Sequence, residues 1–198
     1  MSDTLMRPEA LPTWGQRTSL RLLNMIGWKL HYRPLPGPHG IAVVYPHTSN
    51  WDFVIGILAR YAVSLPLRWI GKDTLFRWPV AGLFRRMGGM PVNRRQSTGL
   101  VGQLRAEFER GEGFYLAIAP EGTRKKTDHW KSGFYRVAVV AGVPLGLGFI
   151  DYPRRRVGIE RYLELTGQEE QDLDRIRAYY GDKRGRYSEK ESDIRFTA

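Results

Sequence analysis

The stretch IAVVYPHTSNWD, residues 41–52, decides how this chain folds and where its chemistry lies. It opens with a short apolar, β-branched run that ends at Pro46, which is the pattern of a buried strand. A polar turn follows, and residues 53–65 are then apolar over a helical length. A strand, a polar turn and a helix in this order predict a unit of an α/β domain.

The same order recurs along the chain. Residues 114–119, FYLAIA, form a second apolar strand that is followed at once by the polar sequence PEGTRKK. The alternation predicts an α/β fold, a single domain with a largely parallel central sheet flanked by helices. After Gly181 the sequence is polar, and we expect a loose tail there. The expected strands are 41–45, 67–70, 90–92, 114–119 and 143–150, and the expected helices are 53–65, 75–87, 100–110, 132–141 and 173–180.

Residues 1–34 are predicted to form a basic amphipathic arm ahead of the main domain. A helix is expected over residues 18–32, because apolar residues recur there at helical spacing with arginines on the opposite side. Such a helix lies either in a lipid interface or on the domain's own core, and the sequence leaves both interpretations open. The main domain then spans 35–165, and a C-terminal helix with a polar tail spans 166–198. The apolar stripe of the arm comprises Leu22, Leu23, Ile26 and Leu30.

The composition limits the classes of function. Among the 198 residues there is no cysteine, which excludes a disulfide framework, a thiolate nucleophile and a cysteine zinc site. Lys and Arg total 31 against 20 Asp and Glu, and the whole net charge of +11 lies in residues 1–150, so an anionic partner is expected there. We find no apolar run long enough to span a bilayer and no signal peptide, and we therefore expect a cytoplasmic protein.

Two polar clusters follow the two apolar strands, at the sheet edge where α/β proteins bind ligands. In the first cluster, Asp52 in the first turn of a helix can reach back to the imidazole of His47. A carboxylate on one imidazole nitrogen fixes the tautomer and leaves the other nitrogen free as a base. Taken alone, an H-x4-D pair is more often only a helix-end charge and a loop residue.

The second cluster, residues 120–126, places three cations, a glycine and a hydroxyl in one loop, which suits phosphate binding. Arg124 can grip an oxyanion with two donors, whereas Lys125 and Lys126 are also explained as solvated charges. A third segment, GGMPVNRR at residues 88–95, brings glycines and arginines together but is a weak signal alone.

Together these segments resemble the glycerophospholipid acyltransferase family, whose best-known members make phosphatidic acid from lysophosphatidic acid. The resemblance rests on four blocks in family order between residues 46 and 145: PHTSNWD, GGMPVNR, PEGTR and GVPL. The second and fourth blocks differ from the usual family form, which leaves the head group of the acceptor open. The combination favours the catalytic interpretation of the H-x4-D pair.

The resemblance implies acyl transfer from a coenzyme A or acyl-carrier-protein thioester to a lipid hydroxyl, in a domain of the glycerolipid acyltransferase type. His47 would be the general base and Asp52 its orienting partner. Arg94 and Arg124 would bind the acceptor's phosphate, in a substrate-binding pocket that Glu121, Gly122 and Thr123 complete. A thioester is activated enough to need no covalent enzyme intermediate, so we expect no cofactor beyond the acyl-CoA or acyl-carrier-protein co-substrate and no metal.

The expected partners are a lysolipid acceptor, the acyl thioester and an anionic membrane surface, on which the protein would sit peripherally at the inner face of the cell membrane. A basic module that binds RNA or DNA is the main alternative, since basic patches fit both functions. We expect no nucleic acid, because the polar motifs follow buried strands and no helix-turn-helix, RRM or KH signature is present. An H-x4-D metallohydrolase would need further ligands, and the other histidines lack ligand spacing.

Overall fold

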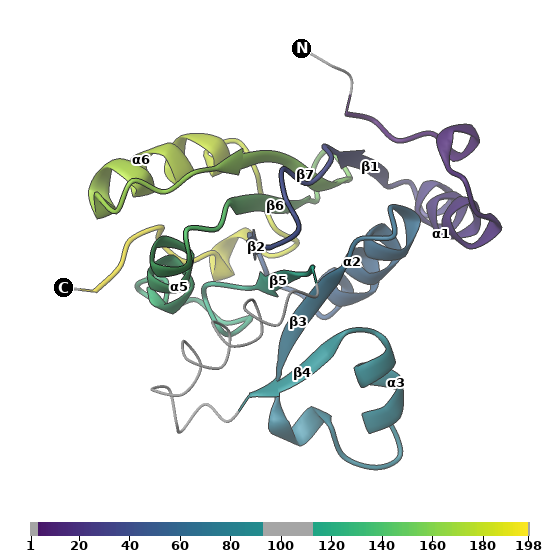
Figure 1. Cartoon of the computed structure of the whole chain (residues 1–198), viewed down its shortest axis with the longest axis horizontal. Coiled ribbons are helices and arrows are strands. Elements are labelled where there is room, and N and C mark those ends of the chain that lie inside the picture. Colours follow the sequence, from purple (N-terminus) through teal and green to yellow (C-terminus); the bar gives the residue numbers. More distant parts are fainter. Residues whose placement is uncertain (1–3, 93–112, 198) are drawn as a thin grey trace.

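The computed structural model describes residues 4–92 and 113–197, and its centre is a seven-stranded sheet in the order β1-β7-β6-β2-β5-β3-β4 (Figure 1). Strands β6, β2, β5, β3 and β4 are parallel neighbours, whereas β7 runs antiparallel to β6 and carries β1 alongside it. The α/β class and the largely parallel sheet are thus confirmed. The strands are β1 (Lys29–Tyr32), β2 (Gly40–Val44), β3 (Leu67–Lys72), β4 (Gly89–Val92), β5 (Tyr115–Ile118), β6 (Leu145–Asp151) and β7 (Arg156–Leu163).

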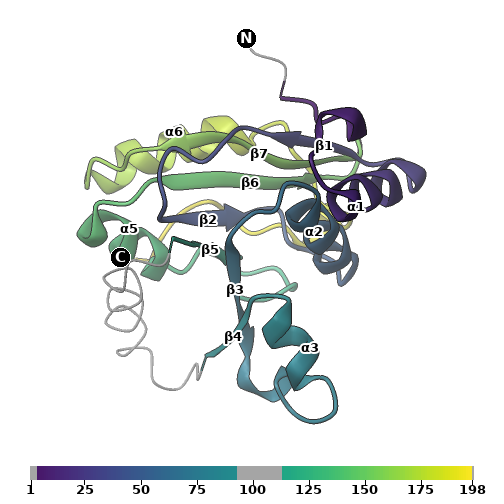
Figure 2. The same cartoon turned by 45° about the vertical axis from the view of Figure 1, so that its right-hand side comes forward.

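Helices cover both faces of this sheet. Helices α5 (Gly133–Ala141) and α6 (Glu169–Tyr180) pack on one face, and α1 (Trp14–Met25) and α2 (Trp51–Ala62) pack on the other (Figures 1 and 2). Alternate residues of β2 divide between the two cores: Ile41 and Val43 belong to the α5/α6 side, and Val44 packs on the α1/α2 side. A strand buried on both faces requires the continuous apolar run that the sequence has at this point.

The smaller elements lie at the edge of the sheet and in the connections. Helix α3 (Ala81–Arg86) and the 3-10 turn Asp73–Leu75 connect β3 to the edge strand β4, so α3 replaces the longer helix expected over 75–87. The other 3-10 turns are Pro8–Ala10 and Ser188–Lys190. The helix expected at 100–110 lies outside the described residues. None of the helices in the described ranges is long and apolar enough to cross a bilayer.

The helix predicted over residues 18–32 is corrected by the structure. Helix α1 begins after Thr13, whose side chain forms a capping box with Gln16, and it ends at Met25. Gly27 follows with φ of +83°, a left-handed conformation that stops the helix, and the chain continues as β1 beside β7. The apolar spacing continued past this glycine, so the prediction extended a helix into a strand.

The predicted apolar stripe of the arm is also wrong. Leu20 and Leu23 are buried against α2, and Leu30 is buried in β1. Leu22 and Ile26, which were predicted on the same stripe as Leu23 and Leu30, are exposed. Helix α1 therefore docks on the domain's own core through a different face and leaves apolar side chains on its outer face.

Two further corrections concern the C-terminal third. Strand β7 was not predicted, because the charged residues Arg156, Glu160 and Arg161 interrupt its apolar pattern. The residues after Gly181 are not a loose tail: Ser192 and Phe196 are buried, and Phe196 packs in the core under α5. This C-terminal segment, residues 182–197, packs against the loops after β2 and β5, where the predicted site residues lie.

Candidate active site

Three neighbouring parallel strands deliver polar side chains to one edge of the sheet. Strand β2 lies between β5 and β6, with Val43 opposite Ile118 on one side and opposite Leu147 on the other. The carboxyl ends of parallel strands share an edge, so the loops after β2, β5 and β6 meet there. The predicted clusters follow the first two of these strands.

His47 and Asp52 meet across the turn between β2 and α2. The imidazole Nδ1 lies 3.2 Å from the carboxylate Oδ2 of Asp52, which sits in the first turn of α2. The same oxygen accepts the backbone N–H of Ser49 at 2.9 Å, and the Ser49 hydroxyl accepts the N–H of Trp51 at 3.2 Å. The turn is thus held by its own side chains, and Asn50 contributes no capping hydrogen bond.

The surroundings of this pair fix its chemistry. Asp52 is only 2% exposed, whereas the His47 side chain is 19% exposed. A buried carboxylate that accepts from Nδ1–H selects one imidazole tautomer and leaves Nε2 as the nitrogen that takes up a proton. The geometry therefore suits a general base whose orientation is set from behind.

Glu121 ties the loop after β5 to the loop after β2. Its Oε2 accepts the backbone N–H of His47 at 3.1 Å, and its Oε1 accepts the backbone N–H of Ser192 at 3.2 Å. The carboxyl group is almost fully buried, and this burial raises the pKa of Glu121 to about 7. Glu121 thus holds the backbone of the predicted base.

The cationic part of the loop faces solvent. Arg124 is exposed, and its Nε donates to the carbonyl of Ser49 at 3.2 Å, which places the guanidinium beside the His47 turn. Gly122 has φ of +66°, and an added Cβ there would meet the side chain of Lys131 at 3.0 Å. The Thr123 hydroxyl accepts the N–H of Lys125. Arg94 lies outside the described residues.

The C-terminal segment completes the loop cluster, and the sequence analysis did not identify it. The Thr48 hydroxyl accepts the N–H of Tyr187 at 3.2 Å, and the Tyr45 hydroxyl donates to the carbonyl of Ser192 at 3.0 Å. Thr127 donates to the Ser192 hydroxyl at 2.9 Å. These contacts join the loops after β2 and β5 to Tyr187 and Ser192, which lie far along the chain in a polar segment without a motif. No local sequence signal therefore marks them.

Tyr152, the first residue after β6, was also missed. Its hydroxyl donates to Oδ1 of Asp52 at 2.6 Å, so it touches the carboxylate oxygen that His47 does not use. The signal that would have found it is its position: strand 143–150 was predicted, and Tyr152, the second residue after it, comes to the same sheet edge as His47.

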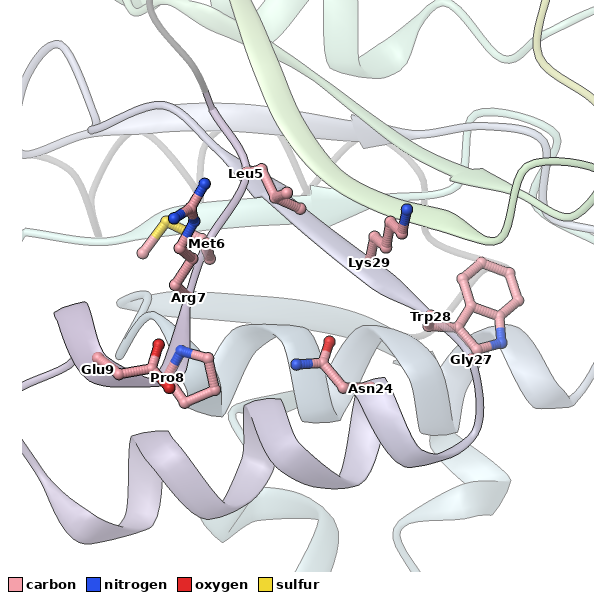
Figure 3. Close-up of a pocket in the computed structure, with 9 residues that line it drawn as sticks. All are labelled: Leu5, Met6, Arg7, Pro8, Glu9, Asn24, Gly27, Trp28 and Lys29. Atoms are coloured by element: carbon pink, nitrogen blue, oxygen red, sulfur yellow. The ribbon is translucent and has the colours of Figure 1, made fainter.

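The hollow in Figure 3 lies elsewhere, between the first residues of the chain, the end of α1 and the start of β1. It contains none of the residues predicted to act on substrate. Within residues 4–92 and 113–197, no three His, Cys, Asp or Glu side chains gather closely enough to hold a metal ion. The hollow is lined by Leu5, Met6, Arg7, Pro8, Glu9, Asn24, Gly27, Trp28 and Lys29.

Comparisons with known proteins identify the family of the chain and a similar fold. The Acyltransferase family model matches residues 29–146, more than half of the chain, and this range includes both polar clusters. Among solved structures, the chain is similar to the crystal structure of the 1-acyl-sn-glycerophosphate (LPA) acyltransferase PlsC from Thermotoga maritima, at 18% identity and a TM-score of 0.54. The similarity covers 86% of this chain and 80% of that chain. No curated protein sequence matches the chain.

Proposed function

The chain belongs to the acyltransferase family, and from this premise we propose that it moves a fatty acyl group from a thioester to the hydroxyl of a lysophospholipid-like acceptor. The donor is acyl-CoA or acyl-carrier protein, and the acceptor is 1-acylglycerol-3-phosphate or a related lipid. The observation that carries the proposal is the 3.2 Å contact between His47 and a buried Asp52 at the carboxyl end of β2.

In the proposed reaction, Nε2 of His47 removes the proton of the acceptor hydroxyl as its oxygen attacks the thioester carbonyl. The tetrahedral intermediate then collapses, the carbon–sulfur bond breaks, and His47 returns the proton to the departing thiolate. One ester and one free thiol result, and no further reagent is consumed. A positioned base of this kind contributes typically about 10²- to 10⁴-fold, which a neutral hydroxyl nucleophile needs.

Arg124 is the proposed contact for the acceptor's phosphate. Its guanidinium sits beside the His47 turn, and the loop that carries it has a glycine at which the backbone can approach an anion. Arg94 has the same proposed role. The planar fork of arginine binds a phosphate with two donors, which fixes the acceptor relative to the base as well as attracting it. The solved structure's name refers to an LPA acyltransferase, which fits a phosphate-bearing acceptor.

A peripheral position on an anionic membrane surface, at the inner face of the cell membrane, is also part of the proposal. The outer face of α1 presents Trp14, Leu22 and Met25, and Arg17 and Arg21 lie beside them on the exposed side of the helix. An apolar stripe flanked by cations is the pattern of a helix that lies in a lipid interface.

The test is mass spectrometry of intact lipids after incubation of purified protein with mixed lysolipids and a long-chain acyl thioester. We expect one class of lysolipid to gain the mass of one acyl chain, with release of an equal amount of free thiol. The matched control is the folded His47→Ala protein under the same conditions. Hydrolysis of the thioester without any acylated lipid would contradict the proposal.

A further inference from the structure

The third strand end at the site carries a residue whose role the proposed function leaves open. Strand β6 is the parallel neighbour of β2 on the side away from β5, and Tyr152 follows it directly. We propose that Tyr152 is a positioning residue that fixes the carboxylate of Asp52, and through it the imidazole of His47. This inference rests on the proposed role of His47 as the base.

Both oxygens of the Asp52 carboxylate are engaged. Oδ1 accepts the Tyr152 hydroxyl at 2.6 Å, while Oδ2 receives the N–H of Ser49 at 2.9 Å and lies 3.2 Å from Nδ1 of His47. A carboxylate held at both oxygens from three directions has one orientation. Without the phenol, only the Oδ2 side remains fixed, and the plane of the carboxylate can turn about that side.

Tyr152 is itself held in place by its surroundings. Its ring meets the ring of Trp28 edge-on, with centroids 4.9 Å apart, and its backbone N–H donates to the carbonyl of Arg184 at 3.0 Å. Trp28 comes from the junction of α1 and β1, and Arg184 comes from the C-terminal segment. Two segments far apart in sequence therefore set the position of one phenol.

All three residues of this support lie outside residues 29–146, the part of the chain that the family model matches. The support therefore comes from outside the matched range, whereas His47 and Asp52 lie within it. Under this proposal, the α1–β1 junction and the C-terminal segment act on the chemistry through Tyr152.

Tyr152 also affects the charge of the Asp52 carboxylate through its neutral hydroxyl. Burial, together with the neighbouring Asp52, raises the pKa of Tyr152 well above its usual range, so the phenol stays a neutral donor. The titratable and charged groups around the pair include Arg186, whose charge acts on Tyr152, Arg124, whose Nε donates to the carbonyl of Ser49, and Glu121, which accepts the N–H of His47. A neutral donor on Oδ1 draws negative charge away from Oδ2, so it limits how strongly the carboxylate attracts a proton on the imidazole.

The test compares Tyr152→Phe with a matched control, Tyr135→Phe. In α5 the Tyr135 hydroxyl donates to Oδ2 of the buried Asp172 at 3.0 Å, remote from the His47 pair in the sequence and packed in the α5/α6 core. Both substitutions keep the ring and delete one tyrosine–aspartate hydrogen bond. Only the first deletes it at the proposed site.

Two readouts are needed. In steady-state kinetics, Tyr152→Phe should lower kcat about tenfold, the effect of losing one hydrogen bond to a charged group, and leave both KM values within about twofold of wild type. In 15N NMR titrations of histidine-labelled protein, the resonance assigned to His47 through His47→Ala should titrate at a higher pH in Tyr152→Phe than in wild type. The Tyr135→Phe protein should match wild type in both.

The NMR readout needs no turnover, so it separates this inference from the proposed acyl transfer. A His47 titration that is unchanged in folded Tyr152→Phe would overturn the positioning role, whatever the activity. An equal loss of kcat in both tyrosine variants would also overturn it, because the loss would then reflect a general structural effect. A shifted titration in a protein that transfers no acyl group would support Tyr152 and reject the proposed function.

Discussion

The turn around Asp52 and the outer face of α1 lie on two helices that pack together, yet they are built from opposite chemistry. Asp52 is 2% exposed and engages polar partners at both carboxylate oxygens. On α1, Trp14 is 78% exposed and Met25 is 75% exposed. The first region holds a fixed geometry through directional bonds, whereas the second offers apolar area whose effect depends on amount rather than on angle.

Helix α1 shows why its outer face is not simply leftover surface. At about 100° per residue, Trp14, Leu22 and Met25 fall on the side opposite Leu20 and Leu23, which are fully buried. The helix is therefore apolar on two opposite sides, and the core uses only one of them. The comparison implies that single-atom changes matter most at Asp52 and its partners, while total apolar area matters most on α1.

The largest expected effect is the loss of kcat when the proposed base in the polar region, His47, is removed. His47→Ala should lower kcat by about 10² or more while the protein stays folded, because an un-ionised hydroxyl is left without its base. Asp52→Asn should lose less, since the base remains but its orienting charge is gone. Single-turnover kinetics on proteins with wild-type circular dichroism measures both losses. A folded His47→Ala protein at a near wild-type rate would remove the proposed mechanism.

Glu121 sharpens the comparison, because its buried carboxyl makes the stability of the protein depend on pH. Burial raises the pKa of its carboxyl to about 7 in the folded protein from 4.5, the ordinary value. Between these two pH values the folded state binds more protons than the unfolded state, so the free energy of unfolding falls as pH rises. The stabilising contribution is complete below pH 4.5 and is lost as pH passes through 7.

Glu121→Gln should remove this dependence. Relative to wild type, the variant's free energy of unfolding should gain up to about 3 kcal/mol between pH 4.5 and pH 8, as follows from the size of the pKa shift. Urea unfolding of both proteins across this pH range measures the difference, and the other titrating groups cancel in it. Two parallel pH curves would show that Glu121 is not held in its neutral form.

The parts of the site that the sequence predicted are those that lie close together along the chain. His47 and Asp52 share one turn, and residues 120–124 form one loop, so strand ends and local spacing were enough to place them. The parallel sheet followed from apolar runs of the right length. Local pattern and fold agreed at these points, which is why the reasoning succeeded there.

The missed parts depend on long-range packing. The N–H of Ser192 meets Glu121 across 71 positions of sequence, and Tyr152 meets Asp52 across 100. Strand β1 pairs with β7, and the charged residues of β7 hide its strand pattern in the sequence. Without a predicted partner strand, residues 29–32 were assigned to a helix from their apolar spacing. Periodicity reports which face is buried, but it does not report which distant segment buries it.

Arg124→Lys tests whether Arg124, at the solvent-exposed edge of the polar region, recognises the acceptor's phosphate. Lysine keeps the charge but not the planar fork, so kcat/KM for a phosphate-bearing acceptor should fall about ten- to a hundredfold, chiefly through KM. The KM for the thioester should move less. The measurement uses two acceptors on both proteins, one with a phosphate and one with a neutral head group. Equal losses for the two acceptors would mean that Arg124 does not recognise the phosphate.

The smallest expected effect concerns the outer face of α1, and substitution tests it better than deletion because residues 29–32 form a strand of the sheet. Trp14→Ser combined with Met25→Ser should weaken binding to anionic vesicles about tenfold, since part of the apolar area that enters the interface is lost. Turnover of a short-chain, water-soluble acceptor should not change, because neither side chain contacts the His47 turn. Val140→Ser, which removes an exposed apolar side chain from α5, is the matched control and should leave vesicle binding unchanged.

Salt then separates the two forces that bind the helix to the membrane. Sedimentation with vesicles at low and high ionic strength should weaken the binding of wild type and of the double variant by the same factor, since both keep Arg17 and Arg21. The difference between the two proteins should survive high salt, because it comes from apolar area. If the double variant sediments with vesicles as well as wild type does at both ionic strengths, the outer face of α1 is not a lipid contact. The region with fixed geometry would then be the only one of the two with a role in acyl transfer.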